Sequence, residues 1–340
     1  MNKKNSNSKN ETLKLAIILV ICLAVLVTLI IMVARLFEKA PTSDTNEPQY
    51  VELPNIEGMN LAQAKILLDN ADIRYEIIPT GSKIPNRVEN IEYIGKIEDD
   101  KTLVDVGTTV KIYSNEVGKD KIIYLTFDDG PTRDNTNDIV FMLEDYGIKA
   151  SFFVEGRDVE LYPDRVEAIF RRGHVIACHS HTHEYASIYS SIDTFISEIG
   201  QYEAALEAAL IEAIGEENFA QIQIKKIIRF PGGTNNAYLT KAEALAYINA
   251  VRALGYTVYD WTALTGDEEF SLEDRNSQNF ISLLESSLAT AKNNNRDLIV
   301  LMHDQVYTKE ALADILDYLI SEGYYFDTID NCPEYTFVEN

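Results

Sequence analysis

The chain has 340 residues, of which 46% are hydrophobic and 25% charged, and its formal net charge is −24 at pH 7. This length leaves room for more than one globular unit with a buried core. Because binding to phosphate backbones requires a basic surface, the strongly acidic composition argues against nucleic acid as a partner.

The first feature along the chain is the apolar run LAIILVICLAVLVTLIIMVA, residues 15–34. Its length matches the roughly 20 residues that a helix needs to cross a bilayer. The following VARLFEK offers no signal-peptide cleavage site, and lysines precede the run, so the positive-inside rule places the N-terminus in the cytoplasm. We therefore predict a cytoplasmic tail (1–14), a transmembrane helix (15–35) and a single-pass location in the cell membrane, with the catalytic domain extracellular.

A polar segment without apolar periodicity, EKAPTSDTNEPQY, predicts a stalk over residues 36–50. The next unit, 51–117, combines one predicted helix with strands at 75–78 and near its end, in VGTTVKIYSNE. The helix carries Leu61, Ala64, Leu67 and Leu68 on one face. A small α+β domain is expected here.

This unit resembles a PASTA module, the extracellular repeat of bacterial wall-sensing kinases and penicillin-binding proteins. The resemblance rests on LPNIEGMNLAQAKILL and on Gly107 and Val110 near the end of the unit. It implies either contact with peptidoglycan or a spacer that lifts the next domain off the membrane.

From Lys121 onward, strand-like apolar runs alternate with longer amphipathic stretches. The runs are KIIYLTF, ASFFVEG, HVIACHS, KKIIRFP, YTVYDW and DLIVLMH, and the stretches are 136–146, 163–172, 193–217, 241–254, 276–293 and 309–322. Such alternation favours a parallel sheet, and this many repeats favour a closed or distorted (β/α) barrel over residues 121–335.

Polar side chains of the kinds used in catalysis stand where these predicted strands end. They are Asp128 and Asp129, His179 and His183, Arg229, Asp260 and Trp261, and His303. In a parallel α/β barrel the carboxyl ends of the strands converge on one face, where active sites are built. An Asp pair before Gly-Pro is by itself more typical of a turn, and two histidines four apart are only weakly specific for a metal. Their convergence predicts a metal site.

Five short motifs occur in order: TFDDGP (126–131), HSHTH (179–183), RFPGG (229–233), YDW ending at Trp261, and IVLMH (299–303). Together they resemble the five motifs of the polysaccharide deacetylases, carbohydrate esterase family four. The resemblance covers residues 121 to about 333 and implies the distorted barrel of that family.

The resemblance also implies the roles of the residues. Asp129, His179 and His183 would bind one Zn²⁺ or a similar divalent ion such as Co²⁺. Asp128 would be the general base, Arg229 would hold Asp128 ionised, and His303 would protonate the leaving amine. The Gly232 N–H would stabilise the oxyanion, and Trp261 would lie at the substrate site. The resemblance thus implies catalytic roles for Asp128, His303 and Arg229, metal binding by Asp129, His179 and His183, and substrate binding by Gly232 and Trp261.

Two departures from the family pattern affect expectations. Thr257 stands where many members carry an aspartate that orients the catalytic histidine, so Asp260 or Asp304 is expected to replace it. Gly232 stands where many members carry an aromatic residue, so a more open subsite is expected, with Tyr185 or Tyr307 available to stack on sugar. His181 falls at a variable position and is expected on a surface loop.

The function predicted from these features is metal-dependent removal of N-acetyl groups from cell-wall polysaccharide, above all peptidoglycan N-acetylglucosamine or N-acetylmuramic acid. Three alternatives stay open: an O-acetyl esterase, a chitin or xylan deacetylase, and a non-catalytic wall-binding protein. The sequence also leaves open whether Cys178 and Cys332 pair, and whether the protein self-associates.

Overall fold

The computed structural model describes residues 49–80 and 84–339. In its N-terminal part, helix α2 (Leu61–Asn70) accompanies two small sheets. One sheet contains β1 (Tyr50–Glu52), β5 (Lys101–Asp105) and β4 (Gly95–Glu98), and the other contains β2 (Arg74–Ile78), β6 (Thr109–Tyr113) and β3 (Asn90–Glu92). Leu61, Ala64 and Leu68 are buried, so the predicted helix face and α+β character are confirmed. The specific assignment to PASTA modules stays a prediction.

The C-terminal part is built on one parallel sheet. Its strands run in the order β11 (Thr257–Val258), β10 (Ile227–Ile228), β9 (Val175–Cys178), β8 (Ser151–Val154), β7 (Ile122–Gly130), β13 (Leu298–His303) and β12 (Ala263–Leu264), and β14 (Tyr325–Asp327) also pairs with β7. In the described chain β11 and β12 are the two ends of this order. The sheet is therefore an α/β half-barrel, which agrees with the predicted distorted barrel and not with a closed one.

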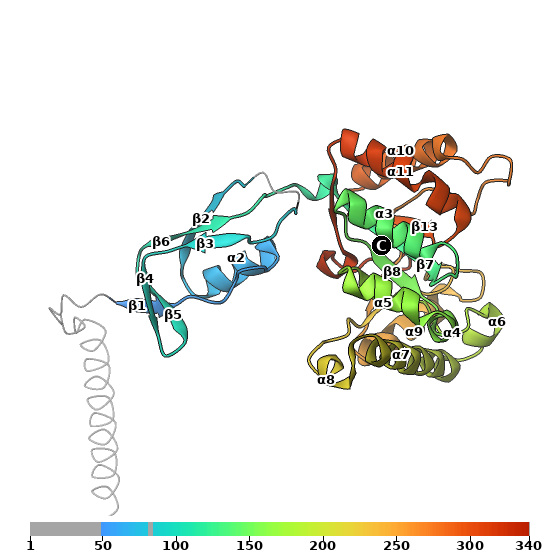
Figure 1. Cartoon of the computed structure of the whole chain (residues 1–340), viewed down its shortest axis with the longest axis horizontal. Coiled ribbons are helices and arrows are strands. Elements are labelled where there is room, and N and C mark those ends of the chain that lie inside the picture. The colour runs from blue at the N-terminus through green and yellow to red at the C-terminus, as the bar shows by residue number, and fades with distance from the viewer. Residues whose placement is uncertain (1–48, 81–83, 340) are drawn as a thin grey trace, which may run out of the picture. The chain divides into compact units, whose positions relative to one another are not determined.

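Helices surround this sheet (Figure 1). They are α3 (Thr136–Tyr146), α4 (Gly156–Leu161), α5 (Pro163–Arg171), α6 (Tyr185–Ile188), α7 (Ile192–Ile214), α8 (Glu216–Phe219), α9 (Lys241–Ala253), α10 (Ser277–Asn293) and α11 (Val306–Ser321), and two short 3₁₀ helices lie at Lys119–Lys121 and Ile329–Asn331. All six predicted helices are present. The helix expected over 193–217 ends at Gly215, whose φ of +83° lies outside the helical range, and α8 follows it.

Alternation along the strands decides which residues face the site. In β7, Ile123, Leu125 and Phe127 join the core that the helices cover. The alternate residues, including Tyr124, point to the opposite face, because successive side chains of a strand point to opposite sides. Asp128 belongs to this second set, and it comes at the carboxyl end of the strand.

The structure corrects the predicted location. Within 49–80 and 84–339, no helix is long and apolar enough to cross a membrane. The longest, α7, carries acidic side chains along its length, including Asp193, Glu203 and Glu212. The single-pass membrane location with a cytoplasmic N-terminus is contradicted by this finding, and the span predicted at 15–35 lies outside the described residues.

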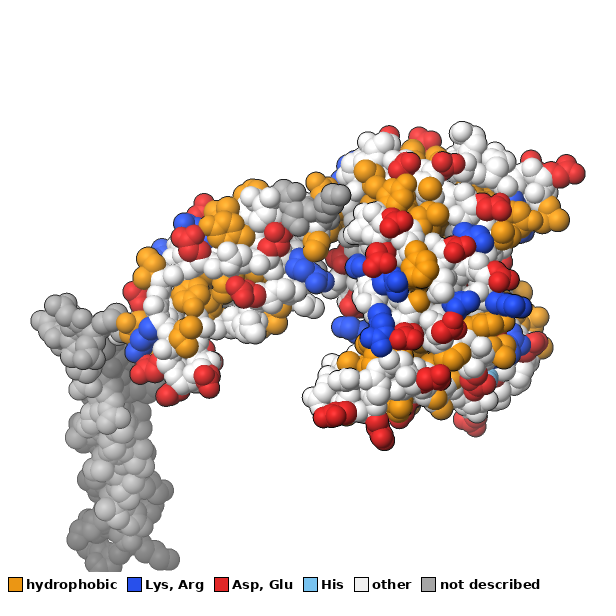
Figure 2. All heavy atoms as spheres, viewed as in Figure 1, with side chains coloured by type: hydrophobic (Ala, Val, Ile, Leu, Met, Phe, Trp, Pro, Cys, Tyr) orange, Lys and Arg blue, Asp and Glu red, His pale blue; other side chains and the backbone are white. Residues whose placement is uncertain are grey.

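The negative charge is dispersed on the face of the molecule seen in Figure 2. Asp and Glu side chains are scattered over this face, and Lys and Arg side chains occur among them. Exposed ion pairs occur in the described chain, such as Lys111 with Glu92 and Arg171 with Glu167. Exposed pairs of this kind contribute little to stability, typically below about 1 kcal/mol each.

Candidate functional site

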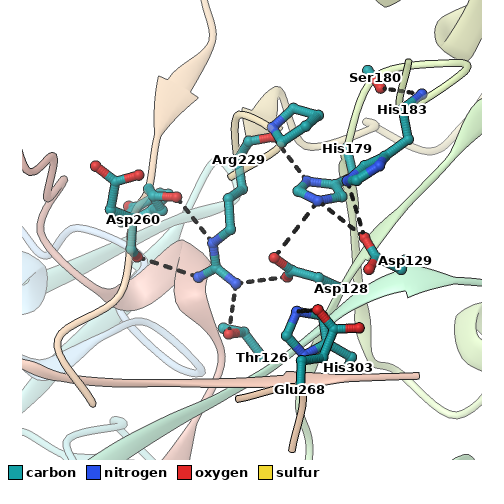
Figure 3. A network of polar contacts seen from close by, with 12 residues as sticks. Thr126, Asp128, Asp129, His179, Ser180, His183, Arg229, Asp260, Glu268 and His303 are labelled. Atoms are coloured by element: carbon teal, nitrogen blue, oxygen red, sulfur yellow. Dashed lines mark hydrogen bonds and ion pairs between the residues drawn. The ribbon is translucent and has the colours of Figure 1, made fainter. Parts of the chain in front are cut away.

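Three side chains predicted as metal ligands meet at the carboxyl ends of β7 and β9 (Figure 3). Oδ1 of Asp129 lies 3.3 Å from Nε2 of His179 and 3.4 Å from Nε2 of His183. Nδ1 of His179 lies 3.0 Å from the carbonyl oxygen of Arg229 and donates a hydrogen bond to it. This bond leaves the lone pair of Nε2 directed at the group, as in a typical metal-binding histidine.

The donors at this group fit a divalent cation. Oδ1 of Asp129 is buried and has no hydrogen-bond partner in the described part of the chain. Burial would raise the pKa of Asp129, but the neighbouring imidazole of His179 outweighs it and lowers that pKa, so the carboxylate is ionised. Two imidazoles and one carboxylate are a donor set that Zn²⁺ uses while keeping a position open. The donor set alone does not select one metal.

Backbone strain is concentrated at this group. Asp129, Ser180 and His183 have φ values of 65°, 68° and 57°, in the left-handed region that residues other than glycine seldom adopt. Such conformations persist only where surrounding contacts hold them, and they are frequent at functional sites. The side chain of Ser180 supplies one such contact, because its Oγ accepts the backbone N–H of His183 at 3.0 Å.

A buried glutamate holds the loop that carries the histidines. Oε2 of Glu198, in α7, accepts the backbone N–H groups of His181 and Thr182 at 3.0 and 2.8 Å. Glu198 is only 5% exposed. This contact could not be predicted from the sequence, since an acidic residue on an amphipathic helix gives no sign of an inward-facing role.

Asp128 and Arg229 form a buried ion pair beside the metal group. Nη1 of Arg229 lies 2.6 Å from Oδ1 of Asp128 and also donates to Oγ1 of Thr126 at 2.8 Å. Nε and Nη2 donate to the carbonyl oxygens of Tyr259 and Asp260. The fully buried guanidinium lies 4.1 Å from the centre of the Phe153 ring. These contacts fix the carboxylate, whose Oδ2 lies 3.7 Å from Nε2 of His179.

His303, at the end of β13, is oriented by Asp267. Nδ1 of His303 donates to Oδ1 of Asp267 at 3.0 Å, and the backbone N–H of His303 donates to Oδ2 at 2.7 Å. Burial opposes protonation, but the hydrogen bond and charge of Asp267 outweigh it and raise the pKa of His303 to about 10. Asp267 thus leaves Nε2 available to a substrate, and this nitrogen carries a proton.

Asp260 and Asp304, which were expected to orient His303, bind other groups, so that expectation is wrong. Asp304 accepts hydrogen bonds from Thr132 and Thr136 in the loop after β7. Asp260 accepts the backbone N–H groups of Thr234 and Phe337 at 2.8 and 2.6 Å. Each carboxylate anchors a loop beside the site.

The subsite beside Gly232 is not open as the sequence suggested, because the ring of Tyr185 occupies it. Gly232 has φ of +73°, and a Cβ built on it would lie 2.9 Å from the ring of Tyr185. This ring contacts His183, with 5.0 Å between ring centres, and Tyr238, with 5.3 Å. An aromatic side chain from the start of α6 therefore fills the space. Gly232 is an exposed residue, and in the described chain no backbone hydrogen bond uses its N–H.

Replacement of Gly232 by alanine should destabilise the protein by more than the left-handed φ alone costs. Gly147 is the matched control, because its φ is +70° and nothing lies within 4 Å of a Cβ built there. We expect Gly147→Ala to lower the free energy of unfolding by about 1 kcal/mol and Gly232→Ala by about 2–3 kcal/mol. Denaturant titration of both variants measures the difference, and equal losses would show that the Tyr185 ring moves aside freely.

The remaining predicted residues are placed as follows. Trp261 is half-buried against Phe337, with its ring centre 5.7 Å from the guanidinium carbon of Arg229. Arg229 in turn contacts His179, so Arg229 lies between Trp261 and the metal group. His181 is not part of that group and packs over Gly156 instead of lying on an open surface. Cys178 and Cys332 are buried free thiols.

The sequence and fold also resemble known proteins. A family of polysaccharide deacetylases matches residues 115–258. A peptidoglycan N-acetylglucosamine deacetylase of Bacillus cereus is 29% identical over 223 residues, which are 64% of this chain and 90% of that protein.

Two solved structures share the fold. The catalytic domain of a peptidoglycan N-acetylglucosamine deacetylase from Eubacterium rectale has a TM-score of 0.53 and 28% identity, covering 64% of this chain and 92% of that one. A CE4 esterase of Streptococcus mutans has a TM-score of 0.52 and 27% identity, covering 62% and 86%. The chain is therefore a hydrolase with a polysaccharide deacetylase domain of the CE4 family.

Proposed function

We propose that this protein removes the N-acetyl group from N-acetylglucosamine, or from N-acetylmuramic acid, in peptidoglycan. The observation that carries the proposal is the placement of two oriented side chains beside the Asp129, His179 and His183 group. Asp128 is held by Arg229, and His303 is held by Asp267. A carboxylate base and an imidazolium acid are the pair that amide hydrolysis requires. The names of relatives in Bacillus cereus and Eubacterium rectale support peptidoglycan as the substrate class.

The chain's own residues account for each proton transfer. Asp128 accepts a proton from a water molecule while the oxygen of that water attacks the acetamide carbonyl carbon. The N–H of Gly232 donates to the oxygen that becomes negatively charged. His303 then gives its Nε2 proton to the departing nitrogen, the C–N bond breaks, and the products are acetate and a free amine.

Asp129, His179 and His183 would hold the divalent ion that this family generally uses, and we propose Zn²⁺. When bound, such an ion supplies Lewis-acid polarisation of the carbonyl and lowers the pKa of water. Arg229 links the two parts of the site, since its carbonyl orients His179 while its guanidinium pairs with Asp128.

We further propose that residues 51–117 act as a PASTA-like unit that contacts the same peptidoglycan. The resemblance of the sequence and the observed α+β fold support this role. Binding of the full chain to insoluble peptidoglycan, compared with a chain lacking residues 51–117, tests it by co-sedimentation. Equal binding by both would remove this role.

Acetate release by the full chain tests the enzymatic proposal. The protein is incubated with purified peptidoglycan, with added Zn²⁺ or with chelator, and mass analysis of the digested glycan identifies the sugar that gained a free amine. We expect release that stops in chelator. Release from acetylated xylan but not from peptidoglycan would favour the O-acetyl esterase alternative, and binding without release from either would favour a non-catalytic wall-binding protein.

Asp267→Asn should lower kcat by about 10- to 1,000-fold and change the pH profile. The carboxylate of Asp267 is what raises the pKa of His303. A general acid works only below its pKa, so the loss of activity at high pH should move to lower pH in the variant. The kcat profile between pH 6 and 10.5 measures this, with Asp304→Asn as the control, and an unmoved high-pH limb would contradict the assignment.

A further inference from the structure

Glu268, which the proposed reaction does not use, lies in a second group of side chains that carry metal-ligand atoms. Its Oε2 lies 3.5 Å from Nε2 of His303, and Figure 3 shows the two side chains together beside Asp128. One ligand atom from each of Asp129, Glu268 and His303 lies within 4.8 Å of the other two. Asp129 is therefore shared between this group and the one formed with His179 and His183.

The two groups are built alike. Nδ1 of His179 is satisfied by the carbonyl oxygen of Arg229, and Nδ1 of His303 is satisfied by the carboxylate of Asp267. The other nitrogen, Nε2, lies beside a carboxylate in both cases, Asp129 for His179 and Glu268 for His303. A histidine oriented by an acceptor on its far nitrogen is the usual arrangement of a metal ligand. Carboxylates that bridge two ions about 3.5–4 Å apart are common in two-metal sites.

A second ion would have to compete with the proton on His303. Four carboxylates gather here, from Asp128, Asp129, Asp267 and Glu268, and the guanidinium of Arg229 is their one permanent positive partner among these contacts. Arg229, the proton on His303 and one divalent ion at Asp129, His179 and His183 together balance these four charges. A second ion on Nε2 of His303 therefore has to displace the proton there.

We propose that Asp129, Glu268 and His303 form a second, weaker and inhibitory site for a divalent cation such as Zn²⁺. The site is weaker because it shares Asp129 with the first ion and because the side chain of Glu268 is 51% exposed. Its inhibitory effect rests on the proposed function, since an ion on Nε2 of His303 occupies the atom that protonates the leaving nitrogen. Its binding of the ion does not depend on that function.

The test combines binding with activity, using the full chain and Zn²⁺ as the probe. Calorimetric titration of metal-free protein should show two ions, and acetate release should peak near one equivalent and fall as Zn²⁺ increases. In Glu268→Gln the second binding event should weaken by about 10- to 100-fold, and the inhibitory Zn²⁺ concentration should rise by a similar factor. Glu269→Gln, the neighbouring exposed carboxylate, should behave like the unaltered protein.

The outcomes separate this inference from the proposed function. Binding of a single ion by the unaltered protein overturns the second site, and so does a second event that is unchanged in Glu268→Gln. Two ions with loss of the second in Glu268→Gln, but no acetate release at any Zn²⁺ concentration, support the site and refute the enzymatic proposal. Anomalous scattering at the zinc edge, from crystals grown with excess Zn²⁺, should place the second ion at Nε2 of His303.

Discussion

Asp128→Asn should abolish most acetate release while leaving the metal in place. The amide cannot accept a proton from water, so we expect kcat to fall on the order of 10²–10⁴-fold. The three ligands Asp129, His179 and His183 are untouched, and the amide oxygen of the new side chain can still accept from Arg229. Steady-state acetate release measures the first effect, and metal content after dialysis measures the second.

Asp129→Asn, one residue further along β7, is the matched comparison. This change removes a ligand whose Oδ1 faces both histidines, so it should lose metal and activity together. Both variants are thus expected to lose turnover, but only Asp129→Asn is expected to lose the metal. Retained turnover in Asp128→Asn, or metal loss equal to that of Asp129→Asn, would show that the roles of the two residues have been assigned wrongly.

The sequence carries enough information to bring the main site residues together because they stand at the ends of long apolar strands. β7 and β13 are nine and six residues long, and their alternation places Asp128 and His303 on one face of the sheet. The pairing of these strands sets His303 directly opposite Asp128. The carboxyl ends of parallel strands lie together at one edge of the sheet, so the side chains at these ends could be predicted to be neighbours.

The residues that orient this set could not be foreseen in the same way. Asp267 follows β12, a two-residue strand that periodicity cannot detect. It contacts His303 because the loop after β12 brings it there. Tyr185 fills the space beside Gly232 only because the start of α6 approaches the loop after β10. Glu198 turns inward to accept two backbone N–H groups. Loop paths depend on many weak contacts, which leave no periodic signal in the sequence.

Arg229→Leu should be among the most destabilising single changes in the described part of the chain. It leaves the carboxylate of Asp128, which is 3% exposed, without its ion-pair partner, and it leaves the carbonyl oxygens of Tyr259 and Asp260 without the donors that Arg229 supplied. Removing one partner of a buried pair typically costs about 3–5 kcal/mol. Denaturant unfolding in chelator measures this loss without a metal ion that could compensate Asp128. Arg252→Leu breaks partly exposed pairs with Glu334 and Glu339 and should cost about 1 kcal/mol or less.

A double variant separates the charge from the packing around it. If the main cost of Arg229→Leu is an uncompensated carboxylate, then adding Asp128→Asn removes that charge and should recover part of the lost free energy of unfolding. The double variant should therefore be more stable than the sum of the two single losses predicts. Simple additivity would mean that Arg229 stabilises the fold mainly through Phe153 and the backbone carbonyls. In that case the ion pair would serve the orientation of Asp128 and not the stability of the half-barrel.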